Sequence, residues 1–83
     1  GLPGRFASLR AAAERNPRNI DVLMALASHH ERQKDFAASR ELYDKILAVN
    51  PRHGPALNNL AYLHAEHLGD LAKAQELAQR ARE

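Results

Sequence analysis

The chain repeats itself along its length, and this internal repeat constrains the fold more than any other sequence feature. Aligning Asn16 with Asn50 superposes the tripeptide Asn-Pro-Arg at 16–18 on the same tripeptide at 50–52, and it also brings His30 onto His64. Beyond His64 the best alignment needs a longer offset, so we expect one inserted residue near His67 and Leu68. A period of this length is typical of stacked arrays, in which each unit buries its apolar face on its neighbours.

Within each period the apolar residues recur every three or four positions, which indicates amphipathic helices. A first helix is expected from roughly Pro3 to Arg15. Four more are predicted around the stripes Val22, Leu23, Leu26 and Ala27; Leu42, Tyr43, Ile46, Leu47 and Val49; Leu57, Leu60, Ala61 and Leu63; and Leu71, Ala74, Leu77, Ala78 and Ala81.

Residues that stop or cap helices stand between these stripes. Pro17 and Pro51 end helices because proline disfavours helical backbone in the preceding residue and lacks an amide donor. Asn19 is expected to cap the second helix, and Pro55 suits a first helical turn. Asp35 and Gly69-Asp70 mark turns inside two hairpins. Because the connections are short, neighbouring helices should be antiparallel.

With the period and turns in place, the chain resembles the tetratricopeptide repeat, whose pattern sets W, L-G, Y, A, F and P at fixed places of each repeat. The first full repeat holds Leu23, Leu26, Ala27, His30, Ser39, Tyr43 and Pro51 at these places, and the second holds Leu57, Leu60, Ala61, His64, Ala74 and Ala78. The resemblance implies an all-α fold, a right-handed superhelical α-solenoid of antiparallel hairpins with about five helices. Residues 1–17 would be a half-repeat, 20–53 the first repeat and 54–83 a truncated second repeat.

Composition limits the classes of function. Eighty-three residues make at most one domain, and without cysteine there is neither a disulfide nor a thiolate metal site. No apolar run approaches the ~20 residues of a membrane span, and no signal peptide opens the chain. The net charge is only +2, although arginine is in local excess before residue 19. Proteins that bind nucleic acids usually carry more positive charge and more aromatic residues than this chain has. The compartment stays open, since the chain begins with Gly1.

Five histidines suggest a metal or acid/base site, but their spacing does not support one. His64 and His67 are three positions apart, whereas helical zinc motifs of the H-E-x-x-H type need four. His30 and His64 recur at the aromatic place of the repeat, so each is expected to pack inside its hairpin; a pH-responsive role is the alternative. No nucleophile elbow or phosphate loop is present. We therefore expect no enzyme activity, no metal and no cofactor.

The resemblance implies a function in protein interaction. In this family the first helix of each hairpin lines a concave groove that accepts a peptide or a partner's helix. Carried onto this sequence, the groove candidates are Met24, Ser28, Arg32, Asn58, Asn59, Tyr62 and Glu66, with Asp21 and Pro55 beside them. Asn59 is the leading candidate, because its amide offers a donor and an acceptor to a peptide backbone; a merely solvated side chain is the alternative. Tyr62 is expected either to anchor a partner or to pack on a neighbouring helix.

The competing hypothesis is a spacer or self-association element that uses exposed apolar ends of the array. Fewer than three repeats are present, so Leu71, Leu77, Ala78 and Ala81 are expected to show part of their apolar surface, which a missing repeat or a second copy would cover. The Ala-rich helices and the run at residues 58–63 resemble bacterial members of the family. The partner is expected to be a protein or peptide.

Overall fold

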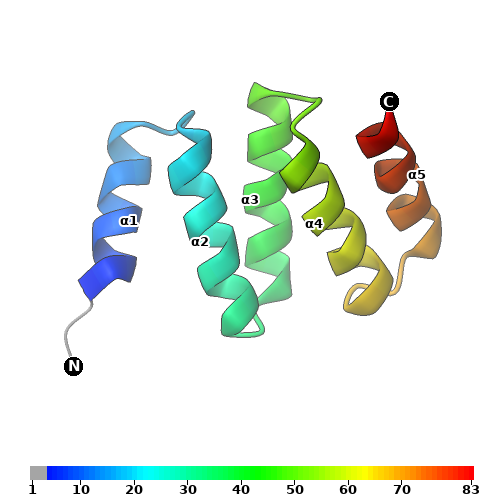
Figure 1. Cartoon of the computed structure of the whole chain (residues 1–83). Coiled ribbons are helices and arrows are strands. Elements are labelled where there is room, and N and C mark those ends of the chain that lie inside the picture. The colour runs from blue at the N-terminus through cyan, green and yellow to red at the C-terminus, as the bar shows by residue number, and fades with distance from the viewer. Residues whose placement is uncertain (1–3) are drawn as a thin grey trace.

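The computed structural model describes residues 4–83, which form five helices side by side in one row (Figure 1). They are α1 (Gly4–Arg15), α2 (Ile20–Arg32), α3 (Phe36–Val49), α4 (Gly54–Glu66) and α5 (Leu71–Arg82). The tightest packing joins α2 to α3 and α4 to α5, while α1 rests on α2 and α3 on α4. No strand occurs within these residues. The predicted all-α solenoid of helical hairpins is confirmed; the expected helix start at Pro3 lies outside the described residues.

Polar side chains start four of the helices. Asn19, Asp35 and Asp70 each accept a hydrogen bond from the backbone N–H three residues later, at 3.2, 3.4 and 3.0 Å. Such caps satisfy an amide that the helix leaves without a partner. The cap at Asn19 was predicted, whereas the start of α4 was not: His53 accepts from the N–H of Ala56 through Nδ1, at 3.2 Å.

The two hairpin turns differ in length. Residues 33–35 join α2 to α3, and residues 67–70 join α4 to α5, so the second turn is one residue longer. Gly69 has a φ of 69°, a left-handed backbone that glycine adopts without strain. Pro55 lies in the first turn of α4, as predicted. The assignment of repeats to residues 1–17, 20–53 and 54–83 stays a prediction.

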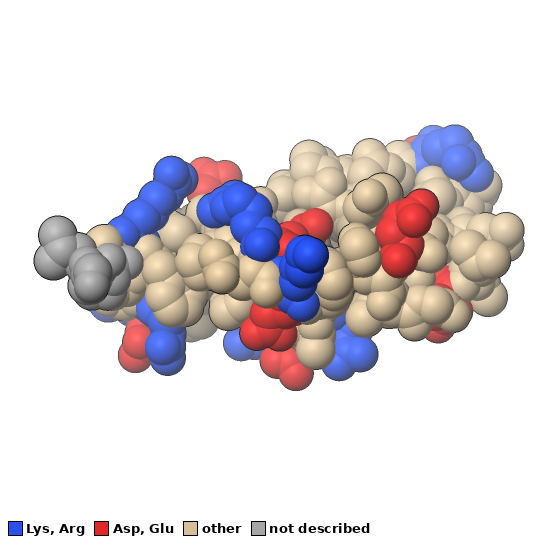
Figure 2. Space-filling model, turned by 90° about the horizontal axis from the view of Figure 1, so that it is seen from below, with Lys and Arg blue, Asp and Glu red and all other residues tan. Residues whose placement is uncertain are grey.

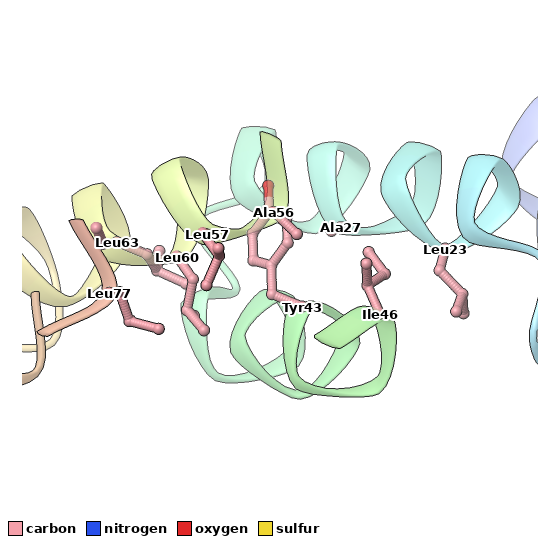
Figure 3. Packing of buried hydrophobic residues seen from close by; sticks show 10 residues of the cluster. Leu23, Ala27, Tyr43, Ile46, Ala56, Leu57, Leu60, Leu63 and Leu77 are labelled. Atoms are coloured by element: carbon pink, nitrogen blue, oxygen red, sulfur yellow. The ribbon is translucent and has the colours of Figure 1, made fainter. Parts of the chain in front are cut away.

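The core runs along the row of helices between two layers. Figure 3 shows α2 and α4 along one side of it and α3 along the other, with their apolar side chains meeting between them. The largest fully buried side chains are those of Tyr43, Ile46, Leu57, Leu60, Leu63 and Leu77. Each buried aliphatic side chain contributes roughly 1.5–3 kcal/mol relative to an exposed one.

The apolar end of the array is only partly as expected. Leu71 is 65% exposed, as predicted, and Ala78 and Ala81 are partly buried. The expectation that Leu77 shows apolar surface is wrong, because Leu77 is 1% exposed. The physical reason is that α5 folds back tightly on α4 and places Leu77 in the common core.

Three polar side chains pack inside the hairpins. Ser39 is fully buried, and its hydroxyl donates to the carbonyl of Ala27 at 2.9 Å, which ties α3 to α2. His64 is buried and His30 is half-buried, as expected for rings at the aromatic place of the repeat. His30 Nδ1 lies 3.6 Å from a carboxylate oxygen of Asp35, while Nδ1 of His64 has no hydrogen-bond partner among the described residues.

Within residues 4–83, each helix is too short or too polar to cross a membrane.

Candidate functional site

The predicted groove residues share one face of two helices, which we call the α2–α4 face. It consists of Met24, Ser28 and Arg32 on α2 and of Asn58, Asn59, Tyr62 and Glu66 on α4. Their spacing of three and four places each set on one side of its helix. Met24 and Ser28 are half-buried and the other five residues are exposed, as are the neighbouring Asp21 and Pro55.

A buried tyrosine holds the two helices of this face together. Tyr43, on α3, is 0% exposed, and Figure 3 shows its hydroxyl pointing across the core toward the layer of α2 and α4. There the hydroxyl donates a hydrogen bond to Oε1 of Glu31 on α2. The Asn59 side chain, on α4, lies near the same hydroxyl. Tyr43 therefore links all three helices at the seam between α2 and α4.

The surroundings of Tyr43 hold its hydroxyl in the neutral form. Burial raises the pKa of Tyr43 above its ordinary value, and the hydrogen bond and negative charge of Glu31 raise this pKa further. The nearby amide of Asn59 has a smaller effect and lowers the pKa. Glu31 was not predicted as part of the site, although it lies three positions after Ser28 on the same helical face.

This pKa shift predicts a loss of stability at high pH. The folded chain keeps the Tyr43 proton above about pH 10, where an unfolded tyrosine loses it, so the free energy of unfolding falls as the pH rises further. At neutral pH the hydroxyl should make wild type about 1 kcal/mol more stable than Tyr43→Phe. Urea unfolding of both proteins from neutral pH to about pH 11 should show this difference shrinking. If the stability difference between the two proteins stayed constant or grew with pH, the raised pKa of Tyr43 would be contradicted.

An aromatic cluster that was not predicted lies beside Tyr62. The ring of His67, in the α4–α5 turn, stacks on Phe36 at the start of α3, with centroids 3.9 Å apart and planes 7° from parallel. Tyr62 meets the His67 ring edge-on at 5.9 Å. The longer turn thus carries a ring that contacts both the preceding hairpin and the candidate face. The sequence offers no signal for this pairing, because the partners belong to different hairpins.

Another histidine, His29, contributes to packing between helices. His29 stacks on Phe6 at 4.3 Å and thereby joins α2 to α1. Within residues 4–83, no group of three or more histidine, cysteine, aspartate or glutamate side chains is placed to hold a metal ion.

Charges of both signs are interspersed along the lower edge of the row of helices in Figure 1, where the α2–α3 and α4–α5 turns lie. Figure 2 views this edge from below and shows basic and acidic side chains interspersed, with uncharged surface in tan between them. The α2–α4 face itself carries one cation, Arg32, and one anion, Glu66. Such a surface has no strong field of a single sign with which to steer a charged ligand.

A separate hollow lies on the opposite side of α2. This α1–α3 groove has a volume of about 760 Å³ and lies between α1 and α3, with Leu23, Leu26 and His30 of α2 among its lining. None of the seven residues of the α2–α4 face lines it.

Comparison with known protein families agrees with this architecture. The model of the tetratricopeptide repeat matches residues 7–48 and, in a second and overlapping match, residues 24–83. The two matches together cover nearly the whole chain, which therefore belongs to the tetratricopeptide repeat family. A search of curated proteins gave no significant match.

Proposed function

We propose that this chain is an interaction module that holds a peptide or a partner protein on the α2–α4 face. Tetratricopeptide repeats generally mediate protein–protein interaction, and the family typically serves as a scaffold rather than as an enzyme. The observation that carries the proposal is Tyr62, a large aromatic side chain that is 57% exposed in the middle of this face. An exposed aromatic ring has a flat apolar surface and a polar tip, a combination typical of recognition surfaces.

The chemistry around Tyr62 suits a peptide backbone. Asn59 lies one helical turn before Tyr62, so its amide and the ring are neighbours on the surface of α4. The amide can donate to a carbonyl and accept from an N–H of a bound segment, while the ring covers an apolar side chain. Because Arg32 and Glu66 offset each other, we expect the partner to be recognised by shape and backbone hydrogen bonds more than by charge.

Contacts behind and beside the face hold its side chains in place. Tyr43 links Glu31 of α2 to the neighbourhood of Asn59 on α4, and His67 packs against the edge of Tyr62. A surface whose side chains are held in place before binding loses less conformational entropy when the partner arrives.

A random peptide library displayed on phage supplies probes for this proposal. Peptides selected on the wild-type chain should bind Asn59→Ala/Tyr62→Ala about tenfold more weakly or worse, a loss of at least about 1.4 kcal/mol, in a fluorescence anisotropy titration. The melting temperature should hardly change, because both side chains are exposed. The matched control is Leu71→Ala/Gln75→Ala, two exposed positions of α5. Equal affinity of the Asn59/Tyr62 variant and wild type, or equal losses in both variants, would refute the proposal.

Self-association is the second candidate function, and the exposed Leu71 favours it. The opening helix points the same way, since the described part of α1 contains no buried residue and packs mainly on α2. Contacts between such ends would join copies of the chain in a row. Sedimentation over a concentration series should then show dimers that Leu71→Asp disrupts; a monomer at every concentration would exclude this function.

A further inference from the structure

The α1–α3 groove is an open, mostly apolar channel on the side of the array that faces away from the α2–α4 face. Leu23 and Leu26 of α2 line it, and Leu42 and Val49 of α3 add apolar surface. Leu23 and Leu26 lie on the side of α2 that faces away from the stripe of Met24, Ser28 and Arg32, as the periodicity of the α-helix requires. The groove and the α2–α4 face are therefore formed by different residues of α2.

The second half of the chain shows what closes such a groove. In the internal repeat, Leu42 on α3 corresponds to Leu77 on α5, and Lys45 corresponds to Arg80. Leu77 is fully buried, and Nη2 of Arg80 donates to the carbonyl of Pro51 at 3.1 Å, which bridges the space between α5 and the α3–α4 connection. The chain thus fills this second place with its own side chains.

In the first half the corresponding side chains do not close the groove. Ala13 of α1 occupies the position that Leu47 of α3 holds in the next repeat, so the apolar filling that a leucine side chain supplies is missing. Leu42 stays only half-buried, and among the described residues Lys45 makes no bond like that of Arg80. The open volume of about 760 Å³ is lined by Ala13, Leu42 and Lys45.

The charges along the groove select what can enter. Arg10, Arg18 and Lys45 line it, against the carboxylates of Glu14 and Glu41. None of the five takes part in an ion pair within residues 4–83. The guanidinium of Arg10 lies 5.8 Å from the centre of the Phe6 ring, a cation–π contact between two residues that line the groove. The groove is therefore apolar inside and carries an excess of positive charge.

We propose that the α1–α3 groove is a second protein-binding site, which takes an acidic amphipathic segment of a partner protein. An aliphatic side chain of that segment enters the space beside Ala13 that leucine fills in the other half. Its carboxylates meet Arg10, Arg18 and Lys45, whose charges have no competing ion-pair partner in the described chain. Burial of Leu42 against the segment stabilises the complex, because apolar surface leaves water. The cations orient the segment and speed its association.

The first test uses a helical peptide built only from leucine, glutamate and alanine, with its leucines on one face, and a second peptide with glutamine at every glutamate position. Fluorescence anisotropy should show saturable binding of the acidic peptide that weakens as salt is raised, and about tenfold weaker binding of the glutamine peptide. Absence of binding by the acidic peptide, or equal binding of the two peptides, would overturn the proposal.

A groove-filling variant locates the site without unfolding the chain. Ala13→Leu should keep or raise the melting temperature, since it restores the leucine of the next repeat, and should abolish binding of the acidic peptide. Ala72→Leu, which adds a leucine at an exposed position of α5, is the control and should bind like wild type. If Ala13→Leu bound as well as wild type, or if Asn59→Ala/Tyr62→Ala lost binding instead, the peptide would occupy another surface and the proposal would be wrong.

Discussion

Replacing Tyr43 with alanine is expected to lower the free energy of unfolding by about 3–5 kcal/mol, the largest loss of any single substitution considered. The side chain is 0% exposed and contributes both the ring that fills the core between three helices and the hydroxyl that reaches Glu31. Its removal leaves a cavity and deprives a half-buried carboxylate of its donor. Chemical denaturation followed by circular dichroism measures the loss.

Tyr43→Phe separates the two contributions of this side chain. It keeps the ring, so about 1 kcal/mol should be lost at neutral pH, from the hydroxyl alone. If Tyr43→Phe cost as much as Tyr43→Ala, the hydrogen bond rather than the packing would hold the helices together. A loss below about 1 kcal/mol for alanine would show that Tyr43 is not central to the core.

Leu77→Ala is expected to cost about 2–5 kcal/mol, although Leu77 lies on the last helix of the chain. Leu42→Ala, its counterpart in the internal repeat, should cost only about 1 kcal/mol, because the wild-type side chain already borders the α1–α3 groove and is half-exposed. The comparison uses the same chemical change at corresponding positions. Thermal and urea unfolding should therefore rank Leu77→Ala well below Leu42→Ala in stability. Equal losses of stability in the two variants would mean that the α1–α3 groove is closed in solution.

Local sequence signals were sufficient to predict the helices. Prolines at 17 and 51, the cap at Asn19 and the turn residues Asp35 and Asp70 act over a few residues, so their effects can be read without knowing the fold. The cap at His53 was missed because histidine is not among the residues that usually cap helices. Burial of Leu77 was missed for a different reason: periodicity marks the apolar side of a helix but does not measure how tightly a neighbour covers it.

In the candidate site, too, features set by local sequence could be predicted, and features that depend on packing between helices could not. The exposed residues of the α2–α4 face follow from helical spacing together with the family resemblance, and their role in binding remains a proposal. The seam at Tyr43 and the stack of His67 on Phe36 join residues from different hairpins or helices, which a repeat pattern cannot pair. The α1–α3 groove depends on a small residue, Ala13, at a place where the chain elsewhere has leucine, and only the packing shows that the space stays open.

Mapping a selected peptide onto the isotope-labelled chain by amide chemical shifts tests the central claim most directly. Bound to wild type, a peptide from the display library should shift the amide signals of α2 and α4 most, around Ser28, Asn59 and Tyr62. Signals from the exposed side of α5 should stay in place. Shifts confined to the ends of the array, with none on α2 and α4, would contradict the claim that this tetratricopeptide repeat protein holds its partner on the α2–α4 face.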